Sequence, residues 1–347
     1  MNNLSIIYRK KHINYIMKWV IISSIPGILL QSYFLGIGVI CQIVLGIITA
    51  IISEVFALYL RKLSILTELK NYTAIITGLL LAINIPPLSP WWLVVIGTSF
   101  AILVVKHTYG GFGQNIFNPA MTGYLILLIS FPLHTTYYYY TIDYNLLDYT
   151  KNFFNDLKII FYGNQNMQTL LMQHNFYLSG LNKLINLNMF EVKKLIIFIT
   201  EILRRIEIYN FLICNKWKLI NLAYCFGGII MIYRKIISWH IPIAYLFTLI
   251  LCSLVSWLIE PVHYPSPLIH VFLGQTMLGI FFIATDPVTS PITKNGSLIY
   301  GIIIGLLTWI IRVYCGYYDG IVFAILLGNL IVSLIDYHTQ FKITIDK

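Results

Sequence analysis

Charged residues are scarce in this chain of 347 residues. Asp, Glu, Lys and Arg make up 10% of it, against roughly 25% in water-soluble domains. Four stretches contain no charged residue at all: 19–53, 71–105, 236–259 and 261–285. Each is longer than the about 20 apolar residues that cross a bilayer. Because the surface of a water-soluble domain must be polar, such repeated runs predict an all-α polytopic membrane protein.

The sequence also lacks the residue patterns that several kinds of site require. The five cysteines form no CxxC pair, so we expect free thiols and no metal or iron–sulfur site on this chain. Neither a Ser–His–Asp set nor a pair of neighbouring carboxylates stands out, which argues against a hydrolase. The formal net charge is +10, but the basic residues gather at the ends of apolar runs and form no stripe with aromatic residues. We therefore expect the lipid bilayer as a partner and no nucleic acid.

The apolar runs divide into ten predicted membrane-spanning helices. The first two runs are each too long for one helix, and each contains a turn signal: glycines within 32–38 and prolines within 85–90. The ten predicted spans are 16–35, 38–60, 73–86, 91–106, 116–134, 218–234, 240–259, 268–285, 297–313 and 319–336.

The positions of Lys and Arg predict the topology. These residues lie at or after the ends of the second, fourth, sixth and eighth spans, and basic loops remain on the cytoplasmic side of a membrane. Both termini are therefore expected in the cytoplasm. Residues 1–134 form a first half with five helices, and residues 218–347 form a second half with five helices and a cytoplasmic tail. Residues 135–217, longer than a connector needs, form an outer loop or small subdomain.

The two halves share the spacing of several small residues. Gly78 lies eight residues before Pro86, and Gly279 lies eight residues before Pro287. A second set, Tyr109, Gly111 and Gly123, recurs with the same spacing as Tyr314, Gly316 and Gly328. Since each half has an odd number of spans, two repeated copies are inverted in the membrane. Such repeats hold polar ligands at their interface near the middle of the membrane, beside broken helices, which we expect at 73–86 and 268–285.

One polar segment follows the eighth span. Residues 285–293 read TDPVTSPIT and include Asp286 and Thr289. Two prolines so close to an acid predict a non-helical insert that binds a cation or an anionic cofactor group. The alternative is an ordinary cap and turn at the end of a span.

A second polar segment, 109–121, leads into the fifth span. It contains Gly111, Gly113, Asn115 and Asn118. Glycines allow a close approach of the backbone, and a helix N-terminus with Asn side chains suits an anion or a planar ring. Tight packing of small residues between helices is the alternative. The segment is not a GxGxxG dinucleotide fingerprint.

Glu54 is an acid inside the second predicted span. Intramembrane acids are functional candidates by default. The alternative is that the side chain of Glu54 reaches toward Arg61 and Lys62 at the end of the same span.

Four segments together resemble the D subunit of the Rnf/Rsx ion-translocating oxidoreductase complexes, which is related to the B subunit of the sodium-pumping NADH:quinone reductase. They are 79–92 (LLLAINIPPLSPWW), 109–121, 285–289 (TDPVT) and 335–337 (IDY). The resemblance implies a transporter-like membrane subunit of a complex that couples electron transfer between redox carriers to ion translocation across a bacterial inner membrane. It also implies FMN as a cofactor, and other membrane and peripheral subunits as partners.

The resemblance fails where that family carries its flavin. In the family, FMN is joined through its phosphate to a Thr in a Ser-x-Ala-Thr-Pro-like motif on the outer loop. The corresponding stretch here is 178–184, LSGLNKL, which places Asn182 at the position of that Thr. An amide cannot form the phosphoester. The flavin is then bound non-covalently, is attached to Ser179, or is lost.

Three functions remain open on the sequence. The first is a flavin-containing subunit whose two polar segments line an ion or electron path. The second is a stand-alone channel or transporter for a small solute, built on the same inverted frame. The third is a scaffold remnant without flavin.

Overall fold

The structure is a computed structural model that describes residues 2–136, 149–162, 215–261, 264–315, 317 and 320–345. All regular secondary structure in this part of the chain is helical. The first half contains α1 (Asn2–Leu35), α2 (Gly38–Leu60), α3 (Ile65–Leu69), α4 (Thr73–Asn84), α5 (Trp91–Phe100), the π-helix η1 (Ala101–Lys106), α6 (Pro119–Ser130) and α7 (Pro132–Thr136). The segment between the two halves contributes α8 (Tyr149–Tyr162). The second half contains α11 (Asn215–Tyr233), α12 (His240–Ile259), α13 (Pro267–Phe272), α14 (Thr276–Leu278), η4 (Gly279–Ile283), α15 (Lys294–Ile310), η5 (Ile311–Cys315) and α16 (Gly320–Ile345).

Helix boundaries follow the turn signals in the sequence. α1 ends before Gly36, whose φ of +94° is accessible to glycine without strain. α4 ends at Asn84, and Ile85 is extended, as expected of a residue that precedes proline. A helix lies at each of the ten predicted spans, although α1 begins earlier than predicted, at Asn2.

Five of the described helices are long and apolar enough to cross a membrane. They are Ile13–Leu35, Gly38–Leu60, His240–Ile259, Lys294–Cys315 and Gly320–Thr339. Shorter apolar helices occupy Thr73–Asn84, Trp91–Lys106 and Pro119–Ser130. The chain is therefore a polytopic helical membrane protein, as the uncharged runs predict, and the count of ten complete crossings stays a prediction.

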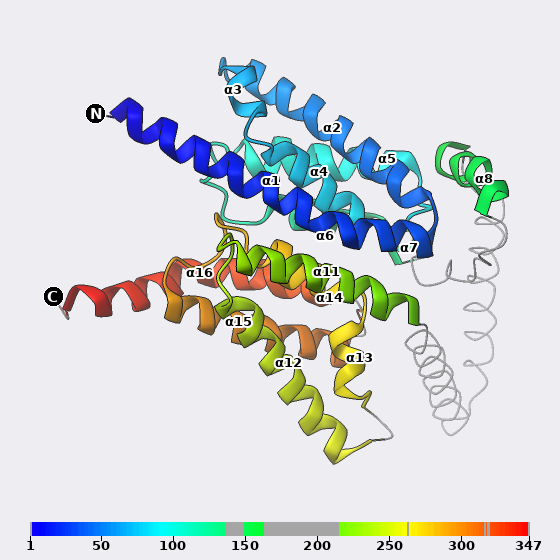
Figure 1. Cartoon of the computed structure of the whole chain (residues 1–347), viewed down its shortest axis with the longest axis vertical. Helices are drawn as coiled ribbons and strands as arrows, with labels where there is room; N and C mark the ends of the chain where they lie inside the picture. Colours follow the sequence, from blue (N-terminus) through cyan, green and yellow to red (C-terminus); the bar gives the residue numbers. More distant parts are fainter. Residues whose placement is uncertain are drawn as a thin grey trace, which may run out of the picture.

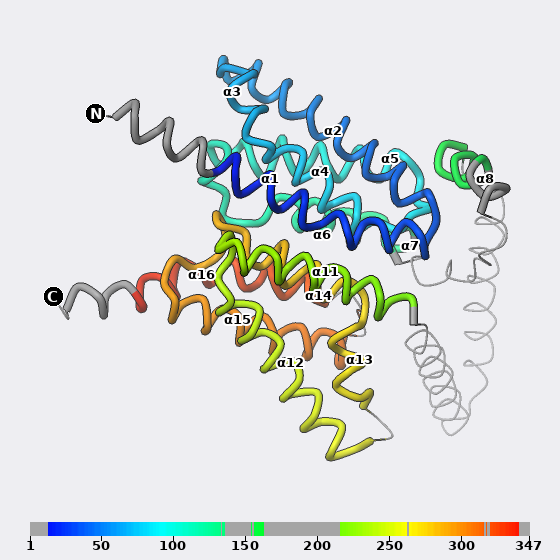
Figure 2. Tube along the Cα trace, in the orientation of Figure 1, coloured from blue at the N-terminus to red at the C-terminus, as the bar shows by residue number. Residues whose placement is uncertain are grey.

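The two membrane halves lie side by side, with α1 packed against α11 and α6 against α16 (Figure 1). α1 and α11 run in opposite directions, and so do α2 and α12 (Figure 2). These are the directions expected of inverted copies. α1 begins and α16 ends at the same end of the bundle, whereas α8 lies at the other end (Figure 1).

The fourth predicted span of each half, α5 in the first and α15 in the second, ends in a π-helical segment that carries a buried cation. Lys106 closes η1, and its Nζ donates to Thr73 Oγ1 at the start of α4 over 3.0 Å. Arg312 lies in η5, and its Nη2 donates to Thr276 Oγ1 at the start of α14 over 2.7 Å. This equivalence of position and hydrogen bonding supports the predicted repeat.

The third helix is broken in the second half, where α13 ends at Phe272 and α14 begins at Thr276. The carbonyls freed by the break have partners. Asn221 Nδ2 on α11 donates to the carbonyls of Phe272 and Gly274 over 3.0 and 2.8 Å, and Arg312 donates to two further carbonyls of the break. In the first half, the corresponding α4 is short and ends at Asn84, just before Pro86, as the sequence predicts.

Candidate functional site

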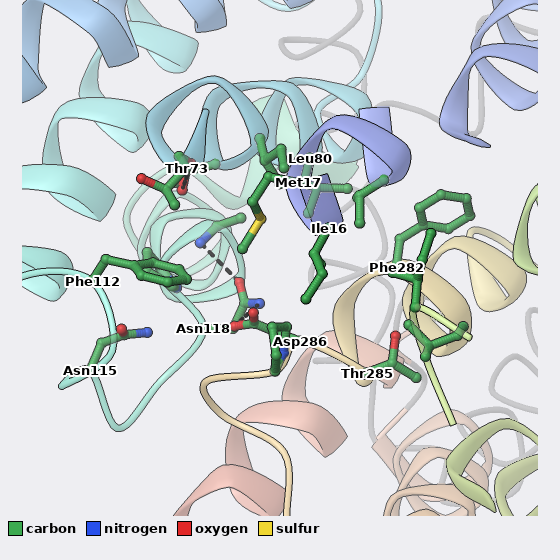
Figure 3. A pocket seen from close by; sticks show the side chains of 18 of the residues that line it. Ile16, Met17, Thr73, Leu80, Phe112, Asn115, Asn118, Phe282, Thr285 and Asp286 are labelled. Carbon is green, nitrogen blue, oxygen red and sulfur yellow. Dashed lines mark hydrogen bonds between the residues drawn. The ribbon is translucent and has the colours of Figure 1, made fainter. Parts of the chain in front are cut away.

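A cavity of about 60 Å³, largely apolar but with several polar side chains in its wall, lies where the two membrane halves meet (Figure 3). It is located where α4 and α6 begin, and is therefore closer to one end of the bundle than to its middle. Residues from both halves line it, among them Met17, Thr73, Lys106, Asn115, Asn118, Phe282, Thr285 and Asp286. The cavity thus brings together the two polar segments, 109–121 and 285–293, which lie far apart in the sequence.

Asn118 connects the first half to the second. It caps the N-terminus of α6: its Oδ1 accepts from the backbone N–H groups of Ala120 and Met121 over 3.1 and 3.3 Å. Pro119 occupies the first helical position, where the missing N–H has no consequence. The side-chain amide is therefore fixed in orientation, and its Nδ2 donates to Asp286 Oδ2 over 3.4 Å.

Asp286 supplies the negative charge of the cavity. It follows the end of η4, and its Oδ2 also accepts from Thr289 Oγ1 over 3.3 Å. Among the residues that the structure describes, no Lys, Arg or His nitrogen lies within 4.0 Å of this carboxylate. The charge is therefore held by neutral donors and stays available to a cation.

Asn115 contributes an oxygen to the same cavity. Its Nδ2 donates to the carbonyl of Phe117 over 3.0 Å, but its Oδ1 is buried and has no hydrogen-bond partner in the described part of the chain. A buried oxygen of this kind calls for a water or an ion. Each water needs about 10–15 Å³ of such space, whereas cofactor pockets measure about 300–1,000 Å³. The cavity therefore fits several waters or a small cation, and it does not fit a flavin.

The remaining predicted site residues are placed as follows. Gly111 and Gly113 have φ values of +103° and +96° and shape the loop before Asn115, outside the cavity wall. Thr289 acts on the cavity through its hydrogen bond to Asp286. Ser179 and Asn182 lie outside the described residues.

Glu54 pairs with a cation from another helix. Lys106 Nζ donates to Glu54 Oε1 over 2.7 Å, and Lys106 is only 2% exposed. The alternative in which Glu54 reaches toward Arg61 and Lys62 at the end of its own helix is therefore wrong. Sequence reasoning missed Lys106 because a Lys at the end of an uncharged run is also the usual marker of a cytoplasmic loop. The one available signal was that a buried acid requires a partner.

His107 links this ion pair to the surface. Its Nε2 lies 3.1 Å from Glu54 Oε2, and its Nδ1 lies 3.1 Å from Arg61 Nη1. Since a guanidinium only donates, Nδ1 accepts, and a neutral His107 carries its proton on Nε2, facing the carboxylate. Arg61 Nη2 also donates to the carbonyl of Gly110 over 2.8 Å. This series of contacts, from Arg61 through His107 and Glu54 to Lys106, therefore holds the loop that contains Gly110 and Gly111 against the cavity wall.

Comparison with known proteins identifies the family of this chain. The family model for NQR2, RnfD and RnfE matches residues 2–344. The chain belongs to this family. A relative from Yersinia enterocolitica is 44% identical over 325 residues, which cover 94% of this chain and 92% of the relative. One from Salmonella enteritidis is 42% identical over 334 residues, covering 96% and 94%. Both are named as the D subunit of an ion-translocating oxidoreductase complex, which confirms the resemblance seen in the four segments.

The Glu54–Lys106 pair predicts a specific pattern of stability in this member of the family. Lys106→Met removes the ammonium partner of the buried Glu54 carboxylate and leaves its contact with His107, which lowers the free energy of unfolding by about 3–5 kcal/mol. Adding Glu54→Gln removes the buried carboxylate charge and recovers most of that loss. Denaturant titration of the purified protein measures both variants. Equal losses in the single and the double variant would contradict the pairing.

Proposed function

We propose that this chain is the membrane-embedded D subunit of an ion-translocating oxidoreductase complex in a bacterial inner membrane. Such a complex couples electron transfer between redox carriers to ion movement, and its other membrane and peripheral subunits are the partners of this chain. The family match over nearly the whole chain and the names of its relatives support this proposal. The termini are placed in the cytoplasm and the segment 135–217 in the periplasm, in accordance with the basic loops.

In this proposal the cavity is part of the ion path. The observation that carries it is the meeting of Asp286 from the second half with Asn118 from the first, beside the unpartnered Oδ1 of Asn115. Carboxylate and amide oxygens are the ligands that hard cations prefer. Ionisable residues inside a membrane bundle mark ion pathways, and sites between inverted repeats are reached from alternate sides. In this topology the cavity lies toward the cytoplasmic end of the path.

The ion path predicts the effect of removing one charge. Asp286→Asn is expected to reduce ion translocation on the order of tenfold or more, equivalent to about 1.4 kcal/mol, because only the neutral donors remain. Uptake of radioactive sodium and of protons into inverted vesicles that contain the complex measures both ions. Glu68→Gln is the matched control, because Glu68 lies on α3 and does not line the cavity. Normal translocation by an assembled Asp286→Asn complex would contradict the role.

For FMN, the proposal concerns only whether the cofactor is attached to this chain. The cavity between the two halves does not fit a flavin, and Asn182 offers no hydroxyl for the phosphoester, so no step of the ion path is routed through FMN. We infer that the chain carries no FMN on residue 182.

This inference has a direct test in the denatured protein. The band of this chain on a denaturing gel should lack flavin fluorescence, because non-covalent flavin is released on unfolding. If the band fluoresces, the Ser179→Ala variant decides the attachment point. Loss of the signal in that variant would place the flavin on Ser179, and a fluorescent peptide containing residue 182 would contradict the inference.

A stand-alone channel for a small solute is the second candidate. The small cavity between the two halves, with polar side chains in a largely apolar wall, is the observation that favours it. The two functions differ in their need for partners. Solute flux in liposomes that contain only this chain supports the channel, whereas transport that requires the partner subunits and an electron donor supports the translocase.

A further inference from the structure

The helix α8 is amphipathic, and its two faces have different neighbours. Asp156 and Ile160, one turn apart, are buried against the rest of the protein, and α8 packs on α2. A Cβ added to Gly36, in the turn between α1 and α2, would lie 3.2 Å from Asp156 Oδ2. α8 therefore lies across the end of the membrane helices, next to the turn that joins α1 to α2 (Figure 1).

The opposite face of α8 forms one side of an open apolar groove. Its residues follow the spacing i, i+3, i+4 and i+7, which places them on one face of a helix. The groove is lined by Trp91 at the start of α5 and by Phe154, Leu157, Lys158, Phe161 and Tyr162 of α8. Phe154 is 76% exposed and Tyr162 is 87% exposed. An exposed apolar patch of this kind marks a binding surface for protein or lipid.

The helix on which α8 packs, α2, presents an exposed apolar stripe. Ile40, Val44, Ile48 and Ile52 follow one another at intervals of four residues along α2, and all four are exposed. In a helix that crosses a membrane, such a stripe contacts acyl chains. The stripe begins at the end of α2 on which α8 packs. Trp91 stands at the same end, at the depth where Trp and Tyr rings gather along a membrane interface.

We propose that this groove binds one phospholipid with an anionic headgroup. One acyl chain lies between Trp91 and the Phe154 and Phe161 rings, and it continues along the α2 stripe. The phosphate lies at the ammonium of Lys158, whose flexible apolar stem allows the charge to reach the headgroups. A lipid is favoured over a protein segment because the helix on which α8 packs presents an exposed apolar stripe and the groove carries one cation at its rim. Amphipathic helices with this pattern lie in membrane interfaces.

Photo-crosslinking from inside the groove tests this proposal. The full-length chain carries p-benzoylphenylalanine in place of Phe154 and is irradiated in nanodiscs that contain equal amounts of phosphatidylcholine and phosphatidylglycerol. Mass spectrometry then identifies the adducts. A single Lys near a membrane surface favours anionic lipid by about fivefold. We therefore expect phosphatidylglycerol adducts to exceed phosphatidylcholine adducts by about that factor, and Lys158→Gln to return the ratio to that of the disc.

Two control positions define the background. The photoreactive residue at Phe247 on α12, which is 64% exposed and lies outside the groove and the α2 stripe, reports bulk lipid in the disc ratio. At Leu66 on α3, which has the same 76% exposure as Phe154, it reports non-specific capture elsewhere on the protein. Adducts from Phe154 to another part of this chain would overturn the proposal, as would lipid in the disc ratio with no effect of Lys158→Gln. Irradiation of the assembled complex in cells adds one outcome that would also overturn it, because a protein adduct there would assign the groove to a partner protein.

Discussion

The constraint on which the rest of this structure depends is the absence of water from the core of a bilayer. Backbone groups that leave a helix there find no solvent, so irregular chain survives only where protein covers it. The carbonyl of Ile83, at the end of α4, illustrates the solution. It accepts from Gln31 Nε2 on α1 over 3.2 Å and from Gln275 Nε2 in the break of the second half over 2.6 Å. Gln31 Oε1 in turn accepts from Tyr224 of α11 over 2.7 Å. The second half therefore helps to satisfy a backbone carbonyl of the first, directly through Gln275 and indirectly through Tyr224 and Gln31.

The same constraint bears on where the cavity lies. The break in the second half is covered by protein groups that bind its carbonyls, and the segment after η4 meets the start of α6 at the surface between the halves. Their side chains meet there as well, so that Asp286 and Asn118 lie in contact although 168 residues separate them. Lys106 pairs with Glu54, whereas the side-chain donors that reach Asp286 in the described part of the chain are the neutral Asn118 and Thr289. The position of the site between the two halves therefore follows from how they pack, independently of any role in transport.

Much of the fold could be predicted, and the reasons are local. Uncharged runs report the membrane directly, and Gly36 and the prolines after Asn84 end helices by backbone geometry alone. Both polar segments of the cavity were recognisable by composition. Their contact was not, because residue spacing within each half carries no information about which side chains meet between halves. Lys106 was assigned to topology, since a basic residue at the end of a span has the same pattern whether it is exposed or buried. The groove at α8 depends on a helix folding back onto α2, which an amphipathic pattern does not specify.

The segment after η4 packs against the start of α6 inside the bundle, and paired cysteines test this packing most directly. In a version of the chain without its native cysteines, Asn118→Cys and Asp286→Cys are combined and treated in membranes with a short thiol cross-linker. We expect rapid cross-linking of this pair, and little when Asn118→Cys is combined with a cysteine at Leu66 on α3. Absence of cross-linking between 118 and 286 in folded protein would contradict the interface and, with it, the cavity.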